Sequence, residues 1–269
     1  MTRAVRRTGV RATAVGVAVV ATGFLVPASA SGGWDYAERG PETWGDHYPT
    51  CEGAAQSPVD IRRGSAVDAD GTPVEDVTLD YARSSEVTVR HTGHTVQVDV
   101  PAGAGTLDVG GAAYELRQLH FHTPSEHRLS GVAQPVELHL VHAAPDGSLA
   151  VVGLLYRERA ADAALRPVLS DLPGSPEDDA RRVTLALDRV VPDDLDVYSY
   201  AGSLTTPPCS ETVTWFVAKD VRSLSSGQVS GLEELFDGPE FPRGNARPVQ
   251  PLGGRPVLAT ELETELETD

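Results

Sequence analysis

The sequence is organised around two runs, Gln118-Leu119-His120-Phe121-His122 and Glu137-Leu138-His139-Leu140-Val141-His142. Side chains on an extended strand alternate between its two faces, so His120 and His122 share one face of the first run. If the two runs pair as neighbouring strands, His139 of the second run joins them on that face. Three imidazoles that leave one position open for water are the ligand set of a catalytic zinc ion. The two runs therefore predict a zinc site on a β-sheet.

The distribution of histidines favours a metal site over a chance grouping of exposed or half-buried histidines. The chain contains eight His, and five of them lie between residues 120 and 142. A ligating imidazole also needs an acceptor for its second nitrogen. Glu137 lies two residues before His139 on the same strand face and is the natural acceptor, and Gln118 stands in the same relation to His120. For both residues, the alternative is a solvated side chain on a strand.

The chain is strongly acidic. Its 269 residues include 22 Lys+Arg and 39 Asp+Glu, which gives a formal net charge of -17 at pH 7. Such a charge argues against nucleic acids and anionic membranes as partners. The length is compatible with a single β-rich domain, and the hydrophobic content of 40% with a sizeable buried core.

Residues 1–30 differ from the rest of the chain. They begin with a basic segment that contains Arg6-Arg7, continue with an apolar run over residues 12–26 and end with Ala28-Ser29-Ala30. This order is typical of a secretory signal peptide with a small-residue cleavage site. We therefore expect a secreted or extracytoplasmic mature protein with no stable membrane insertion after cleavage. The Arg6-Arg7 pair leaves both general and twin-arginine export open.

Short alternating runs separated by turn residues predict a β-rich fold. Residues 87–91 and 94–100 flank Thr92-Gly93, a turn signal. Further predicted strands cover residues 106–109, 113–122, 136–143, 149–156, 183–187 and 212–218. Helices are predicted only at about 160–170 and about 226–236. Because strands and helices do not alternate along the chain, a doubly wound parallel fold is not expected.

One domain accounts for most of the chain. We predict a single domain over residues 31–258, followed by an acidic, disordered tail over residues 259–269. The two cysteines of this exported chain, Cys51 and Cys209, most simply form one disulfide. Two unpaired thiols are the alternative.

Several motifs together resemble the α-class carbonic anhydrases of secreted bacterial type. They follow one another in the family's order between about Trp34 and Leu258. The motifs are Gln56-Ser-Pro-Val-Asp-Ile61, Gln-x-His-x-His at 118–122, Ser125-Glu126-His127, Glu137-Leu-His-Leu-Val-His142, Gly202-Ser-Leu-Thr-Thr-Pro-Pro-Cys209, Thr214-Trp215 and Asn245-Ala-Arg-Pro-Val-Gln-Pro-Leu252. The resemblance implies a mainly β (α+β) domain, with a large, mostly antiparallel, twisted central sheet and short peripheral helices. It also implies a zinc enzyme (Zn2+) that reversibly hydrates carbon dioxide to bicarbonate and a proton through a zinc-bound hydroxide.

The resemblance implies a role for each matched residue. His120, His122 and His139 would bind zinc. Thr205 would accept a hydrogen bond from the zinc-bound hydroxide and donate its own proton to Glu126, which a threonine hydroxyl can do at the same time.

Other matched residues would handle the substrate and the proton. Thr206 would contact bicarbonate. An apolar wall for carbon dioxide would consist of Val141, Val151, Leu204, Val213 and Trp215. His94 would be the proton shuttle, since a histidine can accept and release a proton near neutral pH; Tyr36 and Gln97 would order the intervening water. His91 is a nearby alternative to His94. Cys51 and Cys209 match the disulfide of exported family members.

Two rival interpretations use the same residues. His120-x-His122-x3-Glu126 fits part of a cupin-type metal motif, but Tyr114 and Ala133 stand where that motif requires glycine. The second rival is a catalytically silent member of the same fold that serves as a binding module. Such a protein typically lacks a zinc ligand, whereas all three predicted ligands are present here. The sequence does not distinguish a monomer from a homodimer.

Overall fold

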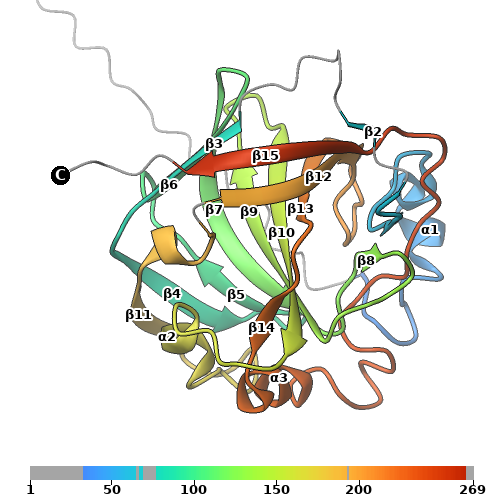
Figure 1. Cartoon of the computed structure of the whole chain (residues 1–269). Coiled ribbons are helices and arrows are strands. Elements are labelled where there is room, and N and C mark those ends of the chain that lie inside the picture. The colour runs from blue at the N-terminus through green and yellow to red at the C-terminus, as the bar shows by residue number, and fades with distance from the viewer. Residues whose placement is uncertain (1–32, 65–66, 69–76, 193, 265–269) are drawn as a thin grey trace, which may run out of the picture. The chain divides into compact units, whose positions relative to one another are not determined.

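A large, twisted β-sheet dominates the described part of the chain (Figure 1). This computed structural model describes residues 33–64, 67–68, 77–192 and 194–264. All of them belong to one compact unit that begins at Gly33. The predicted signal peptide, residues 1–30, lies outside the described residues.

Each of the predicted strands is present, with small shifts at the ends. They are β4 (Ser85–His91), β5 (Val96–Asp99), β6 (Gly105–Val109), β7 (Ala112–His122), β9 (Val136–Ala143), β10 (Leu149–Glu158), β11 (Arg181–Leu185) and β13 (Val213–Ala218). The structure adds strands that the sequence did not predict. These are β1 (Asp60–Ile61), β2 (Val67–Asp68), β3 (Val77–Tyr81), β8 (Arg128–Leu129), β12 (Asp194–Gly202), β14 (Arg222–Leu224) and β15 (Leu258–Thr264).

Most neighbouring strands of the sheet are antiparallel, as predicted. The main path runs β11-β4-β5-β7-β6-β3-β15-β12-β13-β10-β14, and β9 lies between β7 and β10. The parallel pairs are β10–β13, β10–β14, β15–β2 and β15–β3. The predicted fold class is therefore confirmed, with a minority of parallel pairs in the sheet.

The centre of the sheet is buried on both faces. Strands β9 and β10 are buried along almost their whole length. On β9, Leu138 and Leu140 pack into the large core on one face, whereas Val141 belongs to a second apolar cluster on the other face. Because side chains alternate along a strand, His139 faces the same side as Val141. His139 and Val141 of β9 therefore lie on the face of the second cluster.

Helices are few and short among the described residues, which agrees with the prediction. They are α1 (Trp44–His47), α2 (Arg166–Leu169) and α3 (Ser226–Glu233), with 3-10 turns η1 (Pro49–Glu52) and η2 (Leu187–Arg189). The helix predicted at about 160–170 is wrong for its first half. There the Asp162 carboxylate accepts the backbone N–H groups of Ala164 and Leu165 at 2.9 and 3.3 Å, which favours a turn over a helix. The start of α3 is clearly marked in the sequence, because Ser225 and Gln228 form a capping box there.

The predicted disordered tail is wrong for residues 259–264. They belong to β15, whose backbone pairs antiparallel with β12 and parallel with β3. The segment is acidic, but its residues alternate as they do along a strand. Leu258, Thr260, Leu262 and Thr264 occupy one set of positions, and Ala259, Glu261 and Glu263 occupy the other. Residues 265–269 lie outside the described residues.

A disulfide joins the N-terminal arm to the loop before β13. Cys51 and Cys209 are bonded at an S–S distance of 2.01 Å, which confirms the predicted pairing. Around this disulfide, Trp34, Tyr36 and Trp44 form a small apolar cluster of their own. No helix within the described ranges has the length and apolar character that a membrane crossing requires.

We predict that reduction of this disulfide lowers the free energy of unfolding by about 2–5 kcal/mol. The bond closes a loop between residues 158 positions apart, and its loss frees the unfolded chain to occupy many more conformations. Urea denaturation with and without reductant measures the change, after thiol titration has shown that reduction is complete. The Cys51→Ala/Cys209→Ala double variant is the control and should not respond to reductant. An unshifted midpoint in the reduced wild-type protein would contradict the prediction.

Candidate metal centre

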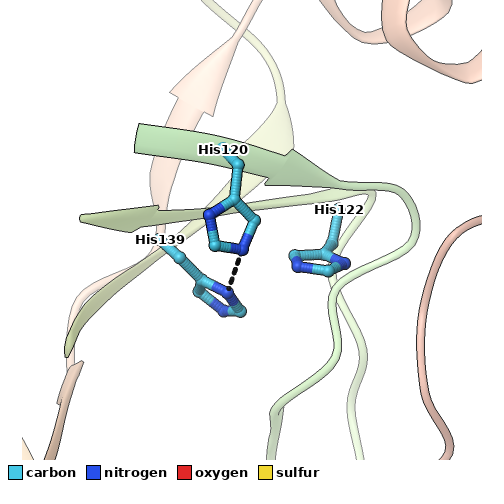
Figure 2. Close-up of side chains that lie close together, drawn as sticks. All are labelled: His120, His122 and His139. Carbon is cyan, nitrogen blue, oxygen red and sulfur yellow. Dashed lines mark hydrogen bonds between the residues drawn. The ribbon is translucent and has the colours of Figure 1, made fainter. Parts of the chain in front are cut away.

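The pairing of β7 with β9 brings three histidines together. In this pair His120 lies opposite His139, and His122 lies opposite Glu137. The ring centroids are 5.0 Å apart for His120 and His122, 5.0 Å for His120 and His139, and 4.7 Å for His122 and His139. One nitrogen of each ring lies within 4.8 Å of the others (Figure 2). The arrangement can therefore present three nitrogen donors to one ion.

Each of the three rings has its other nitrogen held by an oxygen acceptor. The contacts are His120 Nδ1 to Gln118 Oε1 at 2.9 Å, His122 Nδ1 to the Asn245 carbonyl at 2.7 Å, and His139 Nε2 to Glu137 Oε1 at 2.8 Å. A carbonyl or carboxylate oxygen can only accept, so these ring nitrogens carry the protons. The lone pairs are thereby left on Nε2 of His120 and His122 and on Nδ1 of His139. These are the nitrogens that face one another.

The donor set fits a zinc ion. Burial lowers the pKa of all three imidazoles, for His122 to about 4, so the rings are neutral near pH 7. His120 Nε2 and His139 Nδ1 lie 3.2 Å apart, and two lone pairs at this distance repel unless a cation or a proton lies between them. His122 Nε2 is buried and has no hydrogen-bond partner among the described residues. Three neutral nitrogens of this kind are typical zinc ligands.

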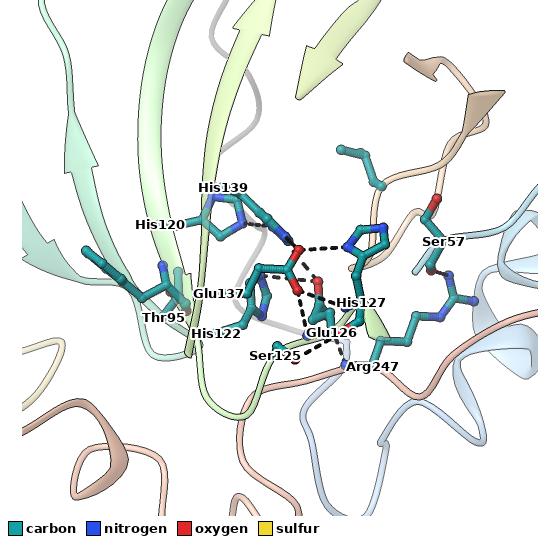
Figure 3. A network of polar contacts seen from close by, with 12 residues as sticks. Ser57, Thr95, His120, His122, Ser125, Glu126, His127, Glu137, His139 and Arg247 are labelled. Carbon is teal, nitrogen blue, oxygen red and sulfur yellow. Dashed lines mark hydrogen bonds and ion pairs between the residues drawn. The ribbon is translucent and has the colours of Figure 1, made fainter. Parts of the chain in front are cut away.

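The Glu137 carboxylate accepts four hydrogen bonds beside the three histidines. Its Oε1 accepts from His139 at 2.8 Å and from His127 Nδ1 at 2.7 Å, and its Oε2 accepts the backbone N–H groups of Glu126 and His127 at 2.9 and 2.8 Å. Burial raises the pKa of this carboxyl, but the two histidines outweigh that effect and lower the pKa well below its usual range. Glu137, His127 and His139 could also be taken for a metal site. Their donor atoms are already used by these hydrogen bonds (Figure 3).

The hydrogen bonds continue away from the centre. His127 Nε2 lies 2.6 Å from the Tyr200 hydroxyl, which lies 2.9 Å from Ser57 Oγ. The three residues are buried. His127 therefore links Glu137, through Tyr200, to Ser57 in the N-terminal part of the domain, and helps to fix the position of Glu137.

Glu126 is a buried carboxylate beside the histidines. Its Oε2 lies 3.4 Å from His122 Nε2 and 3.9 Å from His139 Nδ1, and its Oε1 accepts the backbone N–H of Arg247 at 2.9 Å. Burial raises the pKa of Glu126 to about 7, while His139, the Arg247 backbone N–H and the nearby Thr205 side chain oppose the rise. Oε2 of Glu126 has no hydrogen-bond partner among the described residues. A cation held by the histidines would further favour the ionised carboxylate.

The predicted apolar residues lie together in the second apolar cluster. Its members include Val141, Val151, Val213 and Trp215, with Leu204 packed against them. In the sheet, Val151 lies opposite both Val141 and Trp215. The Trp215 ring centroid lies 4.8 Å from that of His139, so the apolar wall adjoins the histidines. Thr206, half-buried, follows Thr205 in the loop between β12 and β13.

His94 lies in the turn between β4 and β5, away from direct contact with the three histidines. Its ring stacks on Trp34 with 3.9 Å between centroids, and the Tyr36 ring lies 6.3 Å away. Burial lowers the pKa of His94, although a backbone hydrogen bond at Trp34 and the charge of Asp35 oppose the change. The ring is half-buried.

The two neighbours named with His94 in the sequence are engaged elsewhere. His91, on β4, stacks on Phe236 with 5.4 Å between ring centroids. The Gln97 side chain donates to Asp99 Oδ1 at 2.5 Å. The His91 contact does not involve the three histidines, whereas Gln97 lies directly opposite His120 in the pairing of β5 with β7.

Sequence reasoning gave no role to several residues that shape the centre. Asn245 orients His122 through its backbone carbonyl; it begins the motif at 245–252 and is the only asparagine in the chain, but neither feature indicated this contact. Arg247 is buried and donates to Gln56, to the carbonyl of Ser57 and to that of Cys51. Gly153 lies opposite His139, where an added Cβ would be 3.1 Å from Glu137 Oε1. Nothing in the local sequence indicated these last contacts.

Comparisons with known proteins point to one family. A family model of eukaryotic-type carbonic anhydrases matches residues 39–261. Alpha carbonic anhydrase 7 of Arabidopsis thaliana is 37% identical over 229 residues, which cover 82% of this chain and 81% of the plant protein. A carbonic anhydrase of Pectobacterium carotovorum is 34% identical over 241 residues, which cover 87% of this chain and 94% of the relative. The solved α-carbonic anhydrase of Thermovibrio ammonificans, in complex with the inhibitor sulfanilamide, superposes with a TM-score of 0.75 at 34% identity, over 84% of this chain and 98% of the other.

We predict that Glu137→Gln lowers the free energy of unfolding by about 2–5 kcal/mol, because an amide NH2 would face two N–H donors and leave them without an acceptor. Urea denaturation in the presence of a chelator measures the change without any contribution from metal. Glu158→Gln, at the exposed end of β10, is the matched control and should change stability by less than about 0.5 kcal/mol. Equal effects of the two substitutions would contradict the prediction.

Proposed function

The chain belongs to the alpha class of carbonic anhydrases, and we propose that it hydrates carbon dioxide reversibly with a zinc ion held by His120, His122 and His139. The observation that carries this proposal is the convergence of three neutral ring nitrogens whose partner nitrogens are each fixed by an acceptor. When bound, zinc would supply the acidity that turns water into a nucleophile near neutral pH.

Thr205 and Glu126 would select and orient that nucleophile. The carboxylate of Glu126 is fixed by the backbone N–H of Arg247 at 2.9 Å and interacts with the Thr205 hydroxyl. An ionised carboxylate can only accept, so the Thr205 hydroxyl would donate a hydrogen bond to Glu126. The threonine oxygen is then left as an acceptor. It would favour ligands that carry a proton and disfavour those that do not.

The apolar wall would hold carbon dioxide, which lacks strong hydrogen-bonding groups. Trp215 donates its indole N–H to the Ser203 carbonyl at 3.0 Å, so that its ring offers an apolar surface next to His139. Val141 and Val151 extend this surface along the sheet. Thr206, beside Thr205, would contact the bicarbonate product.

His94 would carry the proton to solvent. A histidine whose pKa is lowered by burial is neutral near pH 7 and able to accept a proton, which it then releases to buffer. Its half-buried ring can meet water on the side that Trp34 does not cover. These two properties support the role.

We also propose that the protein acts outside the cytoplasm. The Cys51–Cys209 disulfide is typical of an oxidising compartment. The basic, apolar and small-residue order of residues 1–30 supports the same location.

Metal removal tests the proposed reaction. Stopped-flow hydration of carbon dioxide by the mature chain, residues 31–269, should be fast with zinc, lost after chelation and restored by added zinc. His139→Ala should weaken zinc binding by more than the roughly 10–100-fold that follows loss of a ligand's hydrogen-bond partner. Zinc content and hydration rate are measured together. Retention of both in His139→Ala would overturn the ligand assignment, and zinc binding without hydration would favour the silent binding module.

His94→Ala tests the shuttle. In weak buffer the substitution should lower kcat by about one to two orders of magnitude, because no internal group then accepts the proton. Added imidazole should restore the rate. His47→Ala, an exposed histidine at the end of α1, is the control and should behave as wild type. An unchanged kcat in weak buffer would count against His94.

A further inference from the structure

The side chain of Asn245 joins three separate segments near the metal centre. Its Nδ2 donates to the carbonyl of His94 and to that of Phe121, both at 2.9 Å. Its Oδ1 accepts the backbone N–H of Thr123 at 2.7 Å. The residue has no exposed surface, so water does not compete for these hydrogen bonds. The turn that carries His94 is therefore fastened to the end of β7.

The backbone of Asn245 holds the same end of β7. Its carbonyl accepts from His122 Nδ1 at 2.7 Å, and its N–H donates to the carbonyl of Thr123 at 3.1 Å. Asn245 thus bonds to His122 and to the residues on either side of it. A single residue sets the position of the ligand His122 and of the backbone of His94.

Thr95 makes a second connection between the turn and β7. Its hydroxyl donates to the carbonyl of Phe121 at 2.6 Å and accepts the N–H of Phe121 at 3.2 Å. Other bonds of the turn are internal, such as Thr92 N–H to the Thr95 carbonyl at 2.9 Å, and shape the turn without placing it. Outside the turn, β5 pairs with β7, and the His94 ring stacks on Trp34. Asn245 and Thr95 add the hydrogen bonds that tie the turn itself to the end of β7.

We propose that Asn245 is a positioning residue for proton transfer, whose side-chain amide fixes the His94 turn relative to His122. This inference rests on the proposed function, in which His122 binds zinc and His94 accepts the proton. Transfer over a chain of water molecules depends steeply on the separation and orientation of its ends. A turn released from Asn245 would sample positions from which transfer is slow.

Asn245→Asp is the main test. Aspartate has nearly the same shape and keeps the acceptor for Thr123 N–H, but it places an oxygen against the carbonyls of His94 and Phe121. In weak buffer we expect kcat to fall by about tenfold, more than kcat/KM falls, and imidazole to restore kcat. Rates are referred to zinc content. A role confined to folding or to zinc binding would lower kcat and kcat/KM together and would not respond to imidazole.

Thr95→Val provides a second variant if Asn245→Asp does not fold. It keeps the shape of the side chain and removes only the hydroxyl, and we expect the same pattern with a smaller loss. Combination with His94→Ala then asks whether Asn245 acts through His94. The double variant should be no slower in weak buffer than His94→Ala alone, since residues that act through one another are not additive.

The hydrogen bonds can also be observed directly. Because Asn245 is the only asparagine, labelling with ¹⁵N-asparagine gives one side-chain NH2 signal in the NMR spectrum. We expect this group to exchange with water far more slowly than a free amide. Exchange at the rate of a free amide would overturn the inference.

The kinetic outcomes separate the two proposals. If His94→Ala shows no loss in weak buffer, the shuttle assignment fails and the role of Asn245 fails with it. If His94→Ala is slow but Asn245→Asp and Thr95→Val are not, only the inference about Asn245 is wrong. Equal losses of kcat and kcat/KM in both variants would also overturn it.

Discussion

The pairing register between β7 and β9 is the constraint on which the candidate metal centre depends. Side chains alternate along a strand, so a slip by one residue would turn His120 and His122 to the opposite face. The register is set on the other face, where Leu119 and Phe121 of β7 pack in the large core. The apolar residues therefore decide where the polar ones converge.

Around the paired strands β7 and β9, the buried polar groups form a hydrogen-bond network in which most donors have an acceptor. Glu137 illustrates the principle: four N–H groups bond to its two oxygens, so the buried charge is compensated. Two buried atoms beside the three histidines have no hydrogen-bond partner within the described part of the chain, Nε2 of His122 and Oε2 of Glu126, and they lie 3.4 Å apart. A buried polar atom without a partner is costly, so both atoms are available to an ion or a water molecule at this point.

The parts of this site that sequence could predict are those with local spacing. His120 and His122, with the acceptors Gln118 and Glu137, follow from a period of two on paired strands. Contacts between distant segments have no such signature, and the bond from His122 to Asn245 spans 123 positions. Acidic composition led to a wrong prediction of disorder for β15, because it obscured the alternation typical of a strand. Helix propensity led to a wrong prediction near residue 162, because the Asp162 carboxylate accepts backbone N–H groups and favours a turn.

The distance of Asn245 along the chain has a consequence for how the protein is made. His120 and His139 are only 19 positions apart, so all three imidazoles emerge from the ribosome almost together. The acceptor that fixes the His122 tautomer is synthesised 123 residues after His122. An ion captured by the growing polypeptide would meet a ring that is free to rotate. The complete arrangement of three oriented imidazoles is therefore available only once Asn245 has been synthesised.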